Sequence, residues 1–131
     1  MRASKWTVVV VASVVALSLV SCRVAPIYNV SNAPITAPKA DISLSDVEKA
    51  IMRAGASLGW QMRPTSPGLI VGTLVLRTHT AVVDIKYDTT SYSITYKDSK
   101  NLQYDGTNIH SNYNGWIQRL DNSIKAQLSL I

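Results

Sequence analysis

The hydrophobic and polar positions of this chain follow three different patterns along its length. Residues 7–20 form an unbroken apolar run. Over 44–58 and again over 113–128, apolar side chains recur at the spacing of a helix with one buried face. Residues 60–97 instead alternate apolar and polar side chains, which indicates strands with one buried face. Beyond the apolar run, the pattern predicts a helix, a set of strands and a second helix.

The first predicted helix has signals at both ends. Ser43 and Ser45 can each cap its N-terminus, and Ser45 would form a capping box with Glu48. Gly59 ends the helix, as glycine commonly does at a helix C-terminus. The apolar stripe that should face the core consists of Leu44, Val47, Ile51, Ala54 and Leu58.

Two hairpins are predicted within the alternating region, after a first strand over 60–63, and both agree on which side faces the core. In the first hairpin, a tight turn at Thr78-His79 joins 69–77 to 80–87. In the second, a loop over 88–91 leads into the last strand. A slip by one residue would turn the apolar side outward, so burial specifies the register. The predicted inner pairs are Leu76 with Ala81, Leu74 with Val83, Gly72 with Ile85, Ile70 with Tyr87, Tyr87 with Tyr92, Ile85 with Ile94 and Val83 with Tyr96; the outer pairs include Lys86 with Ser93, Asp84 with Thr95 and Val82 with Lys97.

The second predicted helix follows a polar loop over 99–111 and is capped by Ser111 or Asn112. Asp121 and Lys125 form a favourable pair four residues apart. Two amphipathic helices and a one-faced sheet can bury one another, so both helices should cover the same side. The predicted fold is α+β, a two-layer α-β-β-β-β-α arrangement with a four-stranded antiparallel meander. The apolar stripe of this helix consists of Tyr113, Trp116, Ile117, Leu120, Ile124 and Leu128.

The N-terminal residues are typical of a bacterial lipoprotein signal peptide. Arg2 and Lys5 precede the apolar run, and Leu19-Val20-Ser21-Cys22 closes it in the manner of a lipobox. The run is shorter than the roughly 20 residues of a membrane span. Cys22 is the only cysteine, so it cannot form an internal disulfide. We expect cleavage after residue 21 and lipidation of Cys22; a transmembrane anchor and an ordinary secretory signal are the alternatives.

Charge and sorting refine the expected location. Arg23, rather than Asp, follows the cysteine, and by resemblance to enterobacterial sorting signals this favours the outer membrane. The whole chain carries a net charge of +5, and removal of residues 1–21 takes away two basic residues and no acidic one, leaving +3. This balance suits anionic lipid or cell-wall carboxylates and gives no indication of a nucleic-acid partner.

The segment after the cysteine differs from the rest of the chain. Pro26, Pro34 and Pro38 stand among small and polar residues without apolar periodicity. We expect residues 22–40 to be a lipidated cysteine and an extended tether, which could reach on the order of 50 Å in polyproline geometry. Residues 41–131 then form a single globular domain.

No motif of catalysis is visible in the sequence. The two histidines, His79 and His110, lie far apart, and neither a zinc-binding HExxH pair nor a Gly-x-Ser-x-Gly elbow occurs. Glu48 is the sole glutamate, and Asp84 has no evident carboxylate partner for hydrolysis. We expect no enzyme activity, no metal and no cofactor.

Two surfaces are candidates for binding. One is the outer side of the sheet, where Val75 and Val82 lie among Thr, Lys and Arg. The other is the amide- and aromatic-rich stretch from Asn101 to Trp116, a composition that sugar-binding surfaces often use. Helix capping, core packing and turn formation are the alternative explanations for the same residues. The candidate partner-binding residues are Arg77, His79, Lys86, Lys97, Asn101, Tyr104, His110 and Asn112.

From Ser45 onward the chain resembles a family of small proteobacterial lipoproteins of unknown function. The resemblance rests on Gly59-Trp60, Arg77-Thr78-His79, 84–87, 91–96, 99–102 and 109–116. It implies no activity. We therefore expect a non-catalytic, membrane-anchored lipoprotein of the cell envelope that binds a protein or cell-wall partner. A module that binds a small molecule or a glycan, such as peptidoglycan or lipopolysaccharide, is the alternative.

Overall fold

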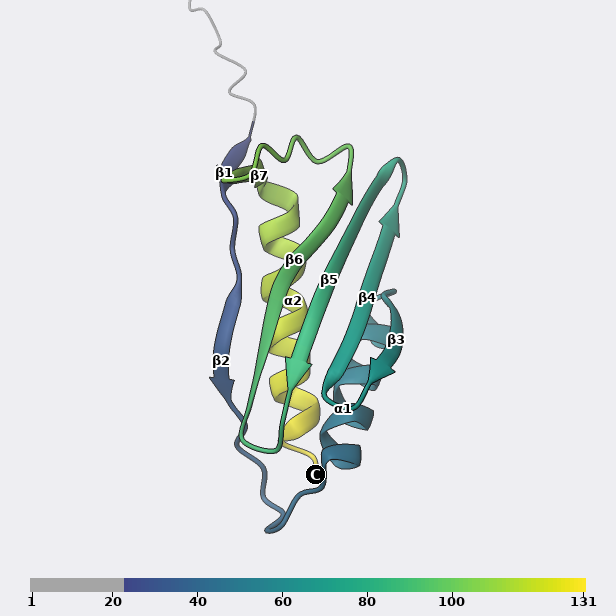
Figure 1. Cartoon of the computed structure of the whole chain (residues 1–131), viewed down its shortest axis with the longest axis vertical. Coiled ribbons are helices and arrows are strands. Elements are labelled where there is room, and N and C mark those ends of the chain that lie inside the picture. The colour runs from purple at the N-terminus through teal and green to yellow at the C-terminus, as the bar shows by residue number, and fades with distance from the viewer. Residues whose placement is uncertain (1–22) are drawn as a thin grey trace, which may run out of the picture.

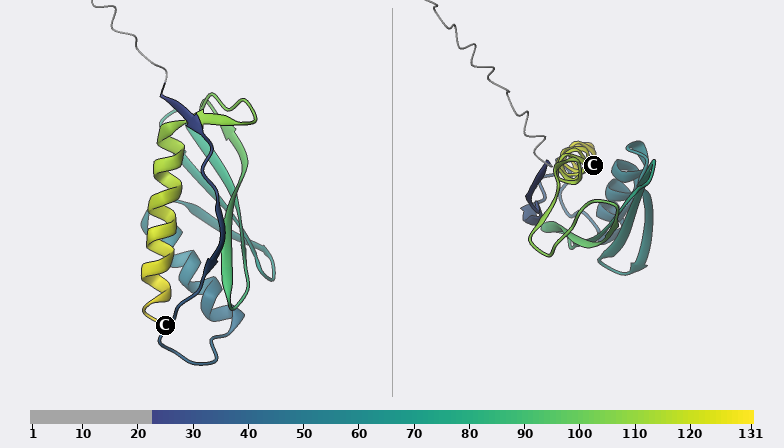
Figure 2. Two further views of the ribbon diagram at one scale, coloured as in Figure 1. Left: turned by 90° about the vertical axis from the view of Figure 1, so that its left-hand side faces the viewer. Right: turned by 90° about the horizontal axis from the view of Figure 1, so that it is seen from above.

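The computed structural model describes residues 23–131, and the predicted signal peptide and Cys22 lie outside this range. Within these described residues, two helices and seven strands follow one another, and both helices lie on one side of the main sheet (Figures 1 and 2). The predicted α+β class and its two layers are confirmed. The elements are β1 (Val24–Pro26), β2 (Val30–Pro34), α1 (Leu44–Ser57), β3 (Gln61–Ser66), β4 (Leu69–Leu76), β5 (His79–Tyr87), β6 (Ser91–Lys100), β7 (Asn108–His110) and α2 (Ser111–Leu128).

The main sheet has five strands in the order β2-β6-β5-β4-β3, all antiparallel to their neighbours. The predicted meander is present as β3 to β6, and the prediction of four strands is wrong because β2 adds to the free edge of β6. The strands β1 and β7 form a separate two-stranded sheet at one end of the molecule (Figure 1).

Residues 23–40 are part of the domain, so the prediction of a tether over this segment is wrong. Val30 pairs with Ile94, and both Val30 and Ala33 are buried. The Arg23 carbonyl accepts a hydrogen bond of 2.7 Å from the Ser111 N–H. Pro34 is tolerated because β2 is an edge strand, where a missing N–H breaks no ladder. The segment is extended, as expected, but it is bound along the sheet and α2.

The β5–β6 hairpin follows the predicted register for most of its length. Tyr87 pairs with Tyr92, and Val83 pairs with Tyr96. A bulge between Val82 and Val83 then shifts the pairing, so that Val82 lies opposite Asp98 instead of Lys97.

The β4–β5 hairpin turns one residue earlier than predicted, at Arg77-Thr78. Leu76 therefore pairs with His79, and Leu74 pairs with Ala81 instead of Val83. Arg77 adopts φ 56°, which places a non-glycine residue in the left-handed region. The predicted partners are wrong, but each strand keeps its inner face because the partner moves by two positions.

The helices begin at caps that the sequence indicated only in part. Ser43 caps α1 and forms a reciprocal capping box with Asp46, so the alternative box at Ser45 and Glu48 is wrong. Gly59, at φ 86°, follows the end of α1 as predicted. His110 caps α2 in place of the predicted Ser111 or Asn112, since β7 runs directly into the helix.

The core lies between the helices and the inner side of the sheet. All six apolar residues of the predicted α2 stripe are buried, whereas Leu58 at the end of the α1 stripe is 37% exposed. Asp121 is a buried acidic residue in this layer: it accepts a hydrogen bond from the Tyr92 hydroxyl and forms the predicted ion pair with Lys125 at 3.0 Å.

Candidate functional site

Six of the eight candidate binding residues gather at one end of the molecule. This end, called the β1–β7 end below, contains β1, β7, the turn between β4 and β5, the loop over 101–107 and the start of α2 (Figure 1). Residues from separate hairpins and from the second helix thus share one region. The six are Arg77, His79, Asn101, Tyr104, His110 and Asn112.

His79 and Asn101 join the β4–β5 turn to the loop that follows β6. The His79 Nδ1 lies 2.7 Å from the Asn101 carbonyl oxygen, and because a carbonyl only accepts, this nitrogen carries a hydrogen and donates it. The Asn101 side-chain amide donates to the Thr78 hydroxyl at 2.8 Å. These bonds hold the two segments together and use polar groups that a ligand would otherwise contact.

His110 is engaged in a different way. Its Nδ1 accepts a hydrogen bond of 3.2 Å from the Asn112 N–H, so this nitrogen carries no hydrogen. The His79 and His110 rings lie with centroids 6.3 Å apart, and the His79 ring lies 6.4 Å from that of Trp116. Each histidine therefore has a structural contact that explains its position.

Three tyrosines pack together at the β1–β7 end, and one of them, Tyr104, belongs to the loop over 101–107. The Tyr96 ring lies 4.0 Å from that of Tyr104 and 5.8 Å from that of Tyr113. Tyr113 is fully buried, burial raises the pKa of its phenol, and its hydroxyl has no hydrogen-bond partner among the described residues. Tyr104 is 40% exposed, so it is the member of this cluster that a partner can reach.

The remaining two candidates, Lys86 and Lys97, lie on the outer sheet face. We use this name for the side chains of β3 to β6 that point away from the helices, such as those of Val75, Val82 and Asp84. Neither helix covers this face (Figure 2). Lys97 is paired with Asp84 at 3.3 Å, whereas Lys86 is exposed and forms no ion pair among the described residues. Val75 is 60% exposed.

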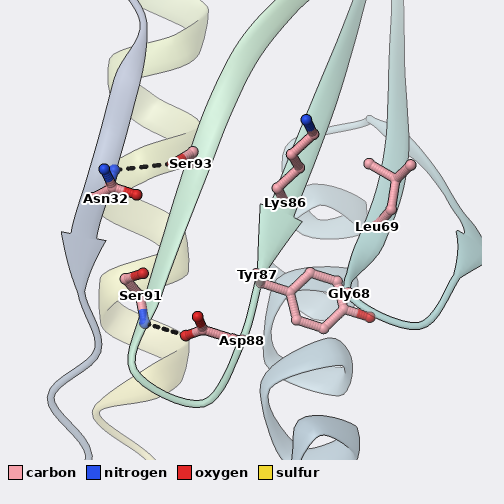
Figure 3. Close-up of a pocket in the computed structure, with 8 residues that line it drawn as sticks. All are labelled: Asn32, Gly68, Leu69, Lys86, Tyr87, Asp88, Ser91 and Ser93. Atoms are coloured by element: carbon pink, nitrogen blue, oxygen red, sulfur yellow. Dashed lines mark hydrogen bonds between the residues drawn. The ribbon is translucent and has the colours of Figure 1, made fainter.

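A shallow hollow of about 350 Å³ lies beside Lys86 (Figure 3). The Asn32 N–H donates to the Ser93 hydroxyl at 2.9 Å, and the Ser91 N–H donates to Asp88 at 2.8 Å. The sequence did not indicate this hollow, because Asn32 belongs to the segment that was predicted to be a tether. The lining residues are Asn32, Gly68, Leu69, Lys86, Tyr87, Asp88, Ser91 and Ser93.

Within residues 23–131, no three His, Cys, Asp or Glu side chains stand where they could hold a metal ion together. Neither helix of this range combines the length and the apolar character that a bilayer crossing needs.

Comparison of the chain with protein-family models, with curated proteins and with solved structures gives no match. The resemblance to small lipoproteins of unknown function therefore stays a prediction.

Proposed function

We propose that this protein is a lipid-anchored, non-catalytic lipoprotein of the bacterial cell envelope, held at the outer membrane, and that its domain binds a protein or cell-wall partner. The observation that carries the proposal is the Leu19-Val20-Ser21-Cys22 sequence after a basic and apolar leader. Two or more acyl chains on one cysteine would give stable attachment, whereas a single chain gives only marginal binding.

The outer sheet face is the surface that we assign to the partner. It is broad and uncovered, Val75 and Val82 provide apolar area, and Lys86, further along β5, forms no ion pair among the described residues. Apolar area framed by polar and charged groups is typical of interfaces between proteins. By contrast, His79, Asn101 and His110 already use polar atoms in hydrogen bonds within the domain.

The anchor is tested with the variant Cys22→Ala. We expect the lipidated protein to float with membranes and to show the mass of the acylated cysteine, and the variant to lose both properties. Circular dichroism and thermal unfolding should be unchanged, because the core is formed by residues from Val30 onward. Continued acylation or membrane flotation of the variant would disprove the assignment of Cys22.

The partner surface is tested by crosslinking and co-purification from membranes. Lys86→Glu combined with Lys97→Glu should reduce recovery of the partner, since the charge of the outer sheet face is reversed. Lys49→Glu is the matched control, because Lys49 is equally exposed but lies on α1, on the other side of the sheet. If the double variant retains every partner that the control retains, the outer sheet face is not the interface.

A glycan fragment is the second candidate ligand, and the hollow beside Lys86 is the observation that favours it. Hydroxyl, amide and charged groups of Asn32, Asp88 and Ser91 line this hollow together with Lys86. Titration with peptidoglycan fragments should give saturable NMR shifts confined to these residues. Shifts that are absent or spread evenly over the domain would remove this candidate.

A further inference from the structure

We propose that the β1–β7 end rests on the surface of the anionic membrane to which the lipid is attached, so that the domain stands upright instead of hanging from a flexible linker. The inference rests on the proposed lipidation of Cys22. It assigns the membrane as the partner of a surface separate from the outer sheet face and fixes which end of the domain faces the lipid.

The proposed lipid attachment site lies directly next to the fold. Arg23 directly follows Cys22, and its carbonyl accepts a hydrogen bond from Ser111. Val24 pairs with His110, and the Ile27 N–H donates to the Thr107 carbonyl at 3.0 Å. A single residue spans at most about 3.6 Å. The acyl chains on Cys22 would therefore hold the β1–β7 end within a few ångströms of the headgroups.

Exposed apolar side chains are present at the β1–β7 end. Val24, Leu76 and Tyr104 are 37%, 46% and 40% exposed, and all three lie at the β1–β7 end. Among the described residues, Leu130 is the large apolar side chain that is exposed at the opposite end. Tyrosine is favoured where one part of a ring meets apolar chains and its hydroxyl meets water. This end therefore carries the side chains that shallow contact with a membrane requires.

The charges at the β1–β7 end also favour an anionic surface. Arg23, Arg77 and Lys100 are exposed at the β1–β7 end. Two acidic residues, Asp98 and Asp105, lie at the same end and accept hydrogen bonds from backbone N–H groups at 2.7–2.9 Å, so these five residues leave an excess of one positive charge. Basic residues near an anionic leaflet are attracted to it within a Debye length.

The opposite end has the reverse balance. This end contains the segment from the end of β2 to the first turn of α1, and the β5–β6 turn. In these two segments one basic residue, Lys39, stands against three acidic residues, Asp41, Asp46 and Asp88. An anionic surface thus favours the orientation with the β1–β7 end down. Because α2 runs along the length of the domain (Figure 2), its eighteen residues place the far end about 27 Å away.

The test measures membrane depth in the full, lipidated protein. Cys22 is the only natural cysteine, so a fluorescent label can be placed on one introduced cysteine, either Leu76→Cys at the β1–β7 end or Thr89→Cys at the opposite end. The probe is a vesicle of phosphatidylethanolamine and phosphatidylglycerol that contains nitroxide-labelled lipid. We expect strong quenching and a blue shift at position 76 and neither at position 89.

Charge variants then test the electrostatic part. Arg77→Gln with Lys100→Gln should reduce the ratio of docked to undocked protein, as read by quenching at position 76, about fivefold for each lost charge. Lys39→Gln with Lys86→Gln removes the same charge elsewhere and should leave the quenching unchanged. Equal quenching in both double variants would overturn the charge argument.

The outcomes separate this inference from the proposed function. If the protein floats with the vesicles but position 76 is quenched no more than position 89, the anchor stands and the seated orientation is wrong. If the protein is not acylated and does not float, the proposed function itself fails.

Discussion

The two ends of the helical layer are stabilised by different kinds of contact. At the end opposite β1 and β7, hydroxyls and N–H groups meet charged partners: Tyr92 donates to Asp121, Tyr87 donates to Glu48, and Ser43 donates to Asp46. At the β1–β7 end, three side chains meet neutral partners, and the carboxylates of Asp98 and Asp105 accept bonds from N–H groups of neighbouring residues. The three neutral contacts are His79 with the Asn101 carbonyl, His110 with the Asn112 N–H, and Asn114 with the Pro26 carbonyl.

This difference affects how each end responds to a change of surroundings. Bonds to ionised groups are about twice as strong as neutral ones, but they depend on the protonation state. At the charged end, burial and then the Glu48 carboxylate raise the pKa of Tyr87 to about 12. Neutral bonds to the backbone keep their partners at any pH at which the side chain stays neutral. Neutral contacts add no further ionised group whose desolvation would cost free energy beside a membrane.

The largest effect is expected for Tyr92→Phe at the charged end. The variant leaves the buried Asp121 carboxylate with one hydrogen bond fewer, and the free energy of unfolding should fall by about 2 kcal/mol. Chemical denaturation of the variant and the parent measures the difference. Tyr87→Phe serves as the comparison, because Glu48 is only half-buried and can regain water; an equal loss in both variants would contradict the role of burial.

A smaller loss is expected for His110→Ala at the β1–β7 end. The variant removes the acceptor for the Asn112 N–H at the start of α2, and loss of a helix cap costs about 1 kcal/mol. His110→Asn should restore the stability, because Asn is among the most favourable N-cap residues. If the Ala and Asn variants unfold at the same denaturant concentration, His110 does not act as a cap.

Tyr113→Phe is expected to change stability less than Tyr92→Phe or His110→Ala. Unlike those two variants, it should not destabilise the domain. The hydroxyl of Tyr113 is buried without a partner in residues 23–131, so its removal eliminates a desolvation cost without breaking a bond. The variant should be as stable as the parent or more stable by up to about 1 kcal/mol. A clear destabilisation, measured by the same denaturation, would reveal a partner such as an ordered water.

The smallest effect concerns acid stability at the start of α1. The Ser43 backbone N–H and then the Lys39 ammonium lower the pKa of Asp46 from 3.8 to about 2. A lowered carboxyl pKa contributes stability above the unfolded value, and this contribution disappears as the pH falls from 3.8 through about 2. Unfolding followed over this range should show a weaker pH dependence in Asp46→Asn than in the control Asp41→Asn. Identical curves would mean that the capping box adds nothing to acid stability.

The sequence predicted those parts of the fold in which several apolar residues share one face. The α2 stripe from Tyr113 to Leu128 and the Tyr87–Tyr92 pairing have such repeated signals, and both are confirmed. Strand β2 buries only Val30 and Ala33, too few positions to produce a visible alternation. The side chains of β6 do not show whether another strand pairs with its backbone edge. The sequence therefore predicted a tether where β2 lies.

The candidate residues could be selected from the sequence, but their arrangement could not. Six of them meet at the β1–β7 end because the hairpin, the loop and α2 end at the same edge of the domain, which requires the tertiary fold. The turn at Arg77-Thr78 was misplaced by one residue because a two-position shift leaves the buried faces of both strands unchanged, and Arg77 at φ 56° gives no turn signal in the sequence. His110 is likewise an unusual cap, and only the contact with Asn112 identifies it.

The pairing of β1 and β2 with much later parts of the chain has a consequence for the order of folding. Val24 meets His110, and Val30 meets Ile94, so the first strands close loops of more than sixty residues. Contacts of such long sequence separation form slowly, because chain entropy is lost before they form. If the chain is exported as proposed, the residues next to Cys22 would therefore stay accessible until β6, β7 and α2 have crossed the inner membrane. In the proposed lipoprotein, this delay gives the acylating and cleaving enzymes an unfolded substrate before the domain closes over its own N-terminus.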